Sequence, residues 1–212
     1  TLGGLTKTDQ GPTEQFWHEL RDEVKWRVEH HIAGVATERY RWLEDEPPPW
    51  HFLKYYRYME RYGAVCVGSP YSLGAWSWVW RKDGTFGPPK KDPDAELSLS
   101  TREEIVRANL NFPADAHENR EIEPADKPGK VKLLLDMAKA FKVDGAIRPL
   151  WRAGVGCDYD SREAAVGLAE AGINVMVYEG SQPGDRTDID ETRLLDQLDM
   201  WMASQGLSKL ED

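Results

Sequence analysis

The alternation of strand-like and helix-like segments in the last third of the chain limits its possible folds more than any other feature. The segments DGAIRPLW at residues 144–151 and INVMVYEG at residues 173–180 contain branched and aromatic residues typical of buried strands. Between them, SREAAVGLAEAG at residues 161–172 has apolar residues at helical spacing and a predicted cap from Asp160 to Glu163. A strand, helix and strand in this order favour a right-handed crossover between parallel strands.

Segments farther upstream extend the same pattern. AVCVG at residues 64–68 predicts a compact buried strand, and VKLLLDMAKAFK at residues 131–142 predicts a helix with an apolar face. WHFLKYYRYMERYG at residues 50–63 indicates a helix stopped by its final glycine, and a last helix is expected at about residues 190–205. We therefore expect an α/β fold in which helices flank both faces of a parallel sheet, a three-layer arrangement of the flavodoxin-like or Rossmann-like type.

The chain divides into two parts by its composition. Residues 1–36 contain a polar, glycine-containing lead and an amphipathic helical arm. Residues 37–212 form the expected α/β domain, which carries a long insertion at about residues 69–127 with a capping box from Thr101 to Glu104. Because the chain begins without an initiating methionine, we expect a processed or truncated product whose first part is absent.

Sheets of this type bind ligands beyond the carboxyl ends of their strands, where the loops converge. Three loops meet this condition, and they follow Val67, Leu150 and Tyr178. The segment RYRWLED at residues 39–45 is interpreted only as a short segment before the proline run at residues 47–49.

The charge pattern excludes one large class of partners. The chain has 37 acidic and 27 basic residues, a formal net charge of -10, and its basic residues are scattered rather than clustered. Nucleic acid is therefore not an expected partner. The sequence shows neither a long apolar run nor a signal peptide, so we expect a cytoplasmic protein without a membrane partner.

The loop WRAGVGCDYD at residues 151–160 is the strongest candidate for chemistry. It places Cys157 just before a helix N-terminus, where backbone N–H groups favour the thiolate that binds iron-sulfur clusters. An isolated cysteine is more often a buried and inert side chain, and that alternative stays open. Cys66 is expected to pack within its strand. A nicotinamide cofactor is disfavoured, because Tyr159 stands where a GxGxxG motif needs its third glycine.

Two further features suggest substrate contacts. Trp76, Trp78 and Trp80 alternate at a spacing of two, so an extended backbone would place them on one face. They could form the wall of an apolar or aromatic substrate pocket, or they could seal a subunit interface. Glu179, at the end of a predicted strand, could position or protonate a substrate, although such a residue is more often a surface or capping residue.

Four segments carry a similarity to a known family: ERYRWLEDEPPPW, ERYGAVCVGSPYSLG, LLDMAKAFKVDGAI with GCD downstream, and EAGINVMVYEGSQPGDR. In this order and spacing they resemble the benzoyl-CoA reductase and 2-hydroxyglutaryl-CoA dehydratase family, that is, the 2-hydroxyacyl-CoA dehydratases. The resemblance runs from about residue 14 to the C-terminus. It is greatest to the C-terminal part of the larger, cluster-binding B-type subunit of benzoyl-CoA reductase.

The resemblance implies a hetero-oligomer of two related subunits with a 4Fe-4S cluster near the acyl-CoA site. It also implies an ATP-hydrolysing activator that delivers electrons, with ferredoxin supplying them indirectly. The family's cysteine loop matches the loop around Cys157, so the ligand role carries over to that residue and not to Cys66. Family subunits usually supply three cysteines, so the other ligands are expected in the missing N-terminal part.

The reaction implied by the resemblance is the radical, reductive dearomatisation of benzoyl-CoA in anaerobic aromatic degradation, which would make the protein an oxidoreductase. One alternative is a lyase, a 2-hydroxyacyl-CoA dehydratase subunit that uses the same electron delivery for radical dehydration. Another is a non-catalytic docking or scaffold fragment. A flavin is a further alternative, because flavodoxin-like loops converge where such cofactors bind.

Overall fold

The structure is a computed structural model of the whole chain. It describes residues 11–45, 48–73, 78–81, 83–87, 100–105, 129–151, 161–180 and 190–211. Contacts within the chain divide it into two compact units, Thr1–Glu38 and Arg39–Asp212. Each unit is described by itself.

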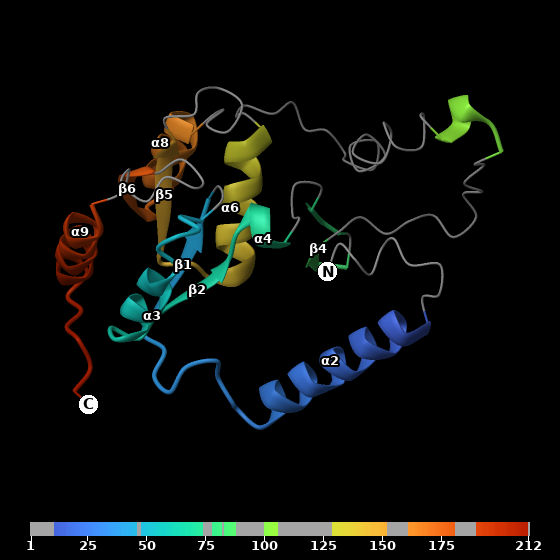
Figure 1. The fold of residues 1–212 in the computed structure, drawn as a ribbon, viewed down its shortest axis with the longest axis horizontal. Helices are drawn as coiled ribbons and strands as arrows, with labels where there is room; N and C mark the ends of the chain where they lie inside the picture. Colours follow the sequence, from blue (N-terminus) through green and yellow to red (C-terminus); the bar gives the residue numbers. More distant parts are fainter. Residues whose placement is uncertain are drawn as a thin grey trace. The chain divides into compact units, whose positions relative to one another are not determined.

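The second unit is built on a four-stranded parallel sheet. Its strands are β1 (Tyr40–Glu44), β2 (Ala64–Gly68), β5 (Gly145–Trp151) and β6 (Asn174–Gly180), in the spatial order β2-β1-β5-β6 (Figure 1). This order follows the first four strands of a flavodoxin-like sheet, and the predicted α/β fold is confirmed. Residues 39–45, for which no strand was predicted, contain β1, an interior strand of the sheet.

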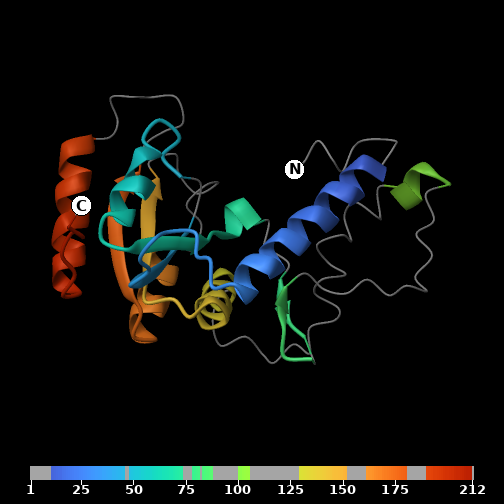
Figure 2. The ribbon, with the colours of Figure 1, turned by 90° about the horizontal axis from the view of Figure 1, so that it is seen from below.

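Helices cover both faces of this sheet. α3 (Lys54–Glu60) and α9 (Glu191–Ser204) pack on one face, whereas α6 (Gly129–Phe141) and α8 (Ser161–Glu170) pack on the other (Figure 2). The direction of the crossovers explains why α3 lies on one face and α6 and α8 lie on the other. The chain moves from β1 to β2 in one direction and from β2 through β5 to β6 in the other, so right-handed crossovers place their helices on opposite faces.

The side chains of β1 alternate between two cores. Tyr40 and Trp42 belong to the core on the α3 and α9 face, and Leu43 belongs to the core on the α6 and α8 face. Trp42 and Leu43 are both completely buried, as expected for an interior strand. Gly145 at the start of β5 gives Tyr40 room, because a side chain there would collide with the tyrosine ring and its hydroxyl.

Local sequence signals at three helix ends are present in the structure, of which the stop at Gly63 and the capping box at Thr101 were predicted. Gly63, with φ of 71°, lies in the turn after α3 and adopts the left-handed conformation that glycine tolerates. Asp190 caps α9 by accepting a hydrogen bond from the backbone N–H of Arg193 at 3.0 Å. The predicted capping box is also confirmed, since Thr101 and Glu104 exchange side-chain to backbone hydrogen bonds.

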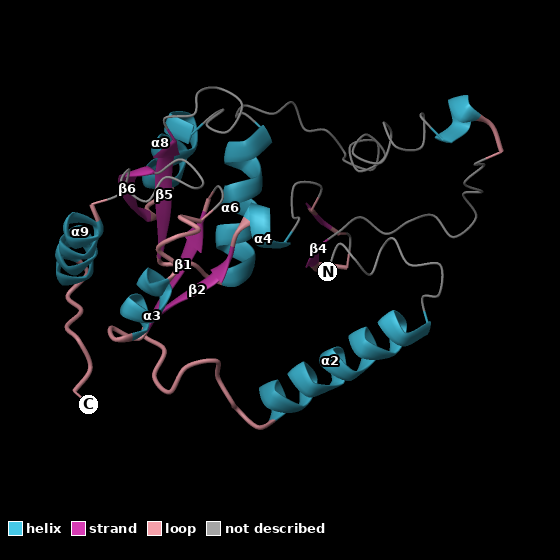
Figure 3. Cartoon of the chain, in the orientation of Figure 1, coloured by secondary structure: helices cyan, strands magenta, loops and turns pink. Residues whose placement is uncertain are grey.

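The described residues of the insertion form a short helix, a two-stranded hairpin and a helical turn at residues 102–105. α4 (Pro70–Leu73) follows β2 directly, and β3 (Val79–Trp80) pairs with β4 (Phe86–Gly87) as an antiparallel hairpin (Figure 3). This hairpin contacts α6 through its aromatic side chains. It therefore belongs to the α6 and α8 side of the sheet.

The first unit contains α2 (Gly11–Glu29), the predicted amphipathic helix. Glu23 and Arg27, four residues apart, form an ion pair at 2.7 Å on its surface. Within the parts of the chain that the structure describes, no helix has the length and apolar character needed to cross a membrane.

Candidate functional site

The residues predicted from sequence fall in different places. Cys157 and Trp76 lie outside the described residues. Trp78 packs edge-to-face against Phe86, with ring centroids 5.6 Å apart, and Trp80 contacts the same ring at 5.3 Å. Both tryptophan rings therefore contact Phe86, and Trp80 remains 37% exposed. Glu179 lies in β6 with an exposed side chain. A substrate contact for any of these residues stays a prediction.

The carboxyl end of β1 is the position that the topology singles out. The connections from β1 and from its neighbour β5 lead to opposite sides of the sheet, which makes this end the switch point where such sheets bind ligands. Two adjacent carboxylates, Glu44 and Asp45, occupy it, and each residue is only 1% exposed. Since they are adjacent, their side chains point to opposite faces of the sheet.

Glu44 faces α3 and is held there by two tyrosines. The hydroxyls of Tyr55 and Tyr56 donate hydrogen bonds to its two carboxyl oxygens. Burial raises the pKa of Glu44 to about 8, although the hydrogen bond from Tyr55 acts in the opposite direction. Glu44 is therefore a neutral carboxylic acid at pH 7.

The other polar neighbours of Glu44 on this face are a phenol and a thiol. Tyr178 in β6 is 4% exposed, and burial together with the Glu44 carboxyl raises the pKa of its hydroxyl well above the usual range. Burial, and to a smaller extent the Glu44 carboxyl, raises the pKa of the Cys66 thiol to about 12. Cys66 packs against the α3 and α9 core, as predicted. Burial and the nearby Glu44 carboxyl therefore keep the Tyr178 hydroxyl and the Cys66 thiol protonated.

Asp45 faces the other side and forms a buried ion cluster. Its Oδ2 lies 3.3 Å from Nζ of Lys130 in the first turn of α6, and it also contacts the guanidinium of Arg148 in β5. All three residues are at most 3% exposed. The cluster therefore ties β1, α6 and β5 together directly behind Glu44, and removal of one charge would leave the others buried without it.

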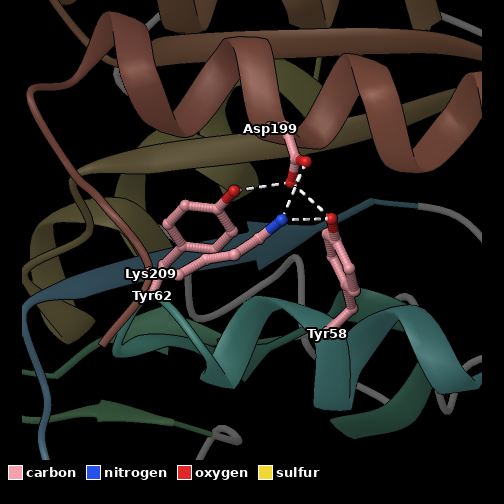
Figure 4. Close-up of polar contacts among 4 residues, drawn as sticks. All are labelled: Tyr58, Tyr62, Asp199 and Lys209. Carbon is pink, nitrogen blue, oxygen red and sulfur yellow. Dashed lines mark hydrogen bonds and ion pairs between the residues drawn. The ribbon is translucent and has the colours of Figure 1, made fainter. Parts of the chain in front are cut away.

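A second polar cluster lies on α3, α9 and the C-terminal segment (Figure 4). Asp199 accepts hydrogen bonds from Tyr58 at 2.6 Å and from Tyr62 at 2.5 Å, and Lys209 contacts both Asp199 and Tyr58. Burial opposes ionisation of Asp199, but these hydrogen bonds outweigh it and lower the pKa of that carboxyl. Because the side chains of Asp199 and Lys209 are about one-third exposed and the polar atoms are mutually paired, we assign the cluster to anchoring the C-terminal segment.

The described residues do not provide ligands for an iron-sulfur cluster. Cys66, with its raised pKa, is a poor source of the thiolate that iron requires. No group of three or more His, Cys, Asp or Glu side chains is placed to hold a metal ion in the described part of the chain. The ligand role of Cys157 thus stays a prediction.

Glu44 is the residue that the sequence analysis missed. A glutamate beside a proline run ordinarily indicates an exposed loop, because unpaired acidic side chains are rarely buried. A signal was nevertheless present in the alternation of Arg39, Tyr40, Arg41 and Trp42, which is the period of a strand. Recognition of that strand would have added its end to the candidate loops.

Comparison with protein-family models gives no match for this chain, and comparison with curated protein sequences gives none either.

Proposed function

We propose that this chain is part of an iron-sulfur enzyme subunit that acts on acyl-CoA thioesters, by reductive dearomatisation of benzoyl-CoA with electrons from an ATP-dependent activator. The starting point is the resemblance of the four segments quoted above. One observation supports it most strongly. These segments contain β1, β2, β6 and the first three residues of β5, four parallel strands whose carboxyl ends lie along a single edge of the sheet.

The character of that edge suits the proposed substrate class. On the face covered by α3, the carboxyl end of β1 is bordered by the aromatic side chains of Trp42, Tyr55, Tyr56 and Tyr178. Aromatic surroundings favour an aryl or acyl group, and exclusion of water protects reactive intermediates. The carboxylic acid of Glu44 adds a neutral polar group within these apolar surroundings.

The cluster itself is assigned to Cys157 and to residues outside this chain, because the described residues do not fit it. A 4Fe-4S cluster would supply low-potential electrons to the acyl group when bound. The contribution of this chain's described residues is to bind and orient the thioester at the edge of the sheet.

The test is to produce the full-length subunit, which includes the residues outside this chain, anaerobically with its related partner subunit. Iron and sulfide content, EPR spectra after reduction and binding of benzoyl-CoA would then be measured, with free CoA and a 2-hydroxyacyl-CoA as comparison ligands. A cluster signal together with tighter binding of benzoyl-CoA than of the other two is the expected result. Preference for the 2-hydroxyacyl-CoA would replace the reductase with the dehydratase alternative. An iron-free assembly that binds no CoA ester would refute the proposal in favour of a scaffold.

A further inference from the structure

The hydroxyl of Tyr178 is buried and has no hydrogen-bond partner among the described residues. The register of the sheet locates it relative to Glu44. Glu44 of β1 pairs with Ile147 of β5, and Ile147 pairs in turn with Met176 of β6. Tyr178 lies two residues after Met176 and pairs with Pro149. Tyr178 therefore lies two strands from Glu44, on the same face of the sheet and one same-face position nearer the carboxyl edge where ligands enter.

Glu44 and Tyr178 together offer two hydrogen-bond donors. The carboxyl oxygens of Glu44 accept from Tyr55 and Tyr56, and the neutral acid keeps a proton of its own that it can donate. Tyr178 has an O–H group in the same surroundings. A buried donor without an acceptor costs free energy, about 1 to 3 kcal/mol. An acceptor atom supplied by a ligand would remove that cost.

We infer that Glu44 and Tyr178 form a two-donor site for the carbonyl oxygen of an acyl thioester. The inference rests on the proposed function, which supplies the thioester. An acyl group that accepts an electron gains negative charge on its carbonyl oxygen, and fixed donors in a water-poor site stabilise such charge. A tyrosine beside a carboxylic acid kept neutral by apolar surroundings is an established way to build an oxyanion site.

The electrostatics of the site restrict the class of ligand. The groups that interact with Glu44 are phenols and a thiol from three packed elements: Tyr55 and Tyr56 of α3, Cys66 of β2, and Tyr178 of β6. α9 adds the apolar side chains of Leu194 and Leu198 to this core. The charged Asp45, Lys130 and Arg148 cluster lies on the opposite face. Among the residues that the structure describes, the donors recorded around Glu44 are neutral, which favours a neutral carbonyl over a carboxylate or a phosphate.

The donor pair can be tested with 4-nitrophenol, whose phenolate imitates a carbonyl oxygen that carries negative charge. The 212-residue chain is expected to bind the phenolate and to lower the apparent pKa of the bound probe. Tyr178→Phe and Glu44→Met should each weaken phenolate binding about ten- to a hundred-fold, as expected for loss of a hydrogen bond to a charged group. Methionine is used at position 44 because glutamine would keep an N–H donor. Absence of binding to the wild-type chain would overturn the inference.

Tyr40→Phe is the matched control. Tyr40 lies on the same face of the sheet, at the start of β1, and its buried hydroxyl likewise has no partner among the described residues. Its removal should leave phenolate binding unchanged, provided that circular dichroism shows each variant to be folded. Equal weakening in Tyr40→Phe and Tyr178→Phe would refute a specific site.

A second measurement separates this inference from the proposed function. Infrared spectra of benzoyl-CoA labelled with ¹³C at the carbonyl should show a lower stretching frequency when it is bound to the chain, and Tyr178→Phe should reverse part of that shift. If benzoyl-CoA binds with the same frequency in both proteins, the two-donor site is wrong and the proposed function stands. If the phenolate binds as expected but benzoyl-CoA does not bind, the proposed function fails and the pair recognises a different carbonyl compound.

Discussion

Replacement of Glu44 by glutamine should change how the stability of the protein depends on pH. In the folded protein the pKa of Glu44 is raised from 4.5 to about 8, so the native state retains a proton that the unfolded chain releases. This contribution to stability is fully present below pH 4.5 and is lost as pH rises through 8. Glutamine is uncharged at every pH, and its amide oxygen can accept from one of the two tyrosines while its NH2 group donates to the hydroxyl oxygen of the other.

The size of the effect follows from the interval between the two pKa values. Each pH unit in that interval changes the free energy of unfolding by about 1.4 kcal/mol, so the loss between pH 4.5 and pH 8 accumulates to about 4 to 5 kcal/mol. A typical domain is stable by only about 5 to 15 kcal/mol, so this loss is large. The advantage of Glu44→Gln over the wild type should therefore grow steadily across the interval.

Urea unfolding followed by tryptophan fluorescence at several pH values between 4.5 and 8.5 would measure this difference. Glu163→Gln, at an exposed glutamate in the first turn of α8, is the control for loss of an acidic group. A constant free-energy difference between wild type and Glu44→Gln across the series would refute the reasoning. It would mean that Glu44 is ionised in the folded protein at neutral pH.

Three other changes have defined expected outcomes. In the assembled enzyme, Cys157→Ser should lower the iron content measured after anaerobic purification, whereas Cys66→Ser should not, and equal iron in both would contradict the ligand assignment. Asp45→Ala should lower the free energy of unfolding in urea by about 3 to 5 kcal/mol, because it leaves buried cations without their carboxylate; a loss below about 1 kcal/mol would show the cluster to be solvated. Lys209→Met should lower the free energy of unfolding by less than about 1 kcal/mol, because the ion pair with Asp199 is partly exposed. It should nevertheless speed hydrogen exchange at the amide of Leu210, which donates to the backbone carbonyl of Arg61. Unchanged exchange would show that the ion pair does not anchor the C-terminal segment.

The fold class could be predicted because the later strands and helices are long and regularly patterned. β5 and β6 each have seven residues, and the helix between them has a clear apolar face. β1 could not be recognised in the same way. It has five residues, its apolar side chains enter both cores, and it ends with an acid beside a proline run. Its place between β2 and β5 depends on pairing with distant segments, which local patterns do not encode.

The candidate site was predictable in position but not in composition. The rule that ligands bind at the carboxyl ends of parallel strands points to this edge from the pattern alone, and ligand binding there stays a prediction. The neighbours of Glu44 could not be predicted from the sequence, because Tyr178 interacts with Glu44 only once β6 has joined the sheet. The raised pKa is likewise a property of the assembled core, since burial is its main cause.

The interior position of β1 also sets the order in which the sheet can form on the ribosome. β1 can pair with β2 early, but its other edge must wait for β5, and the hydrogen bond between Arg41 and Asp144 spans 103 residues. During that interval the nascent chain exposes an unpaired strand edge and the uncovered side chain of Leu43, which normally lies beneath α6. The length of the insertion between β2 and α6 therefore sets how many residues must be synthesised before β1 can pair with β5.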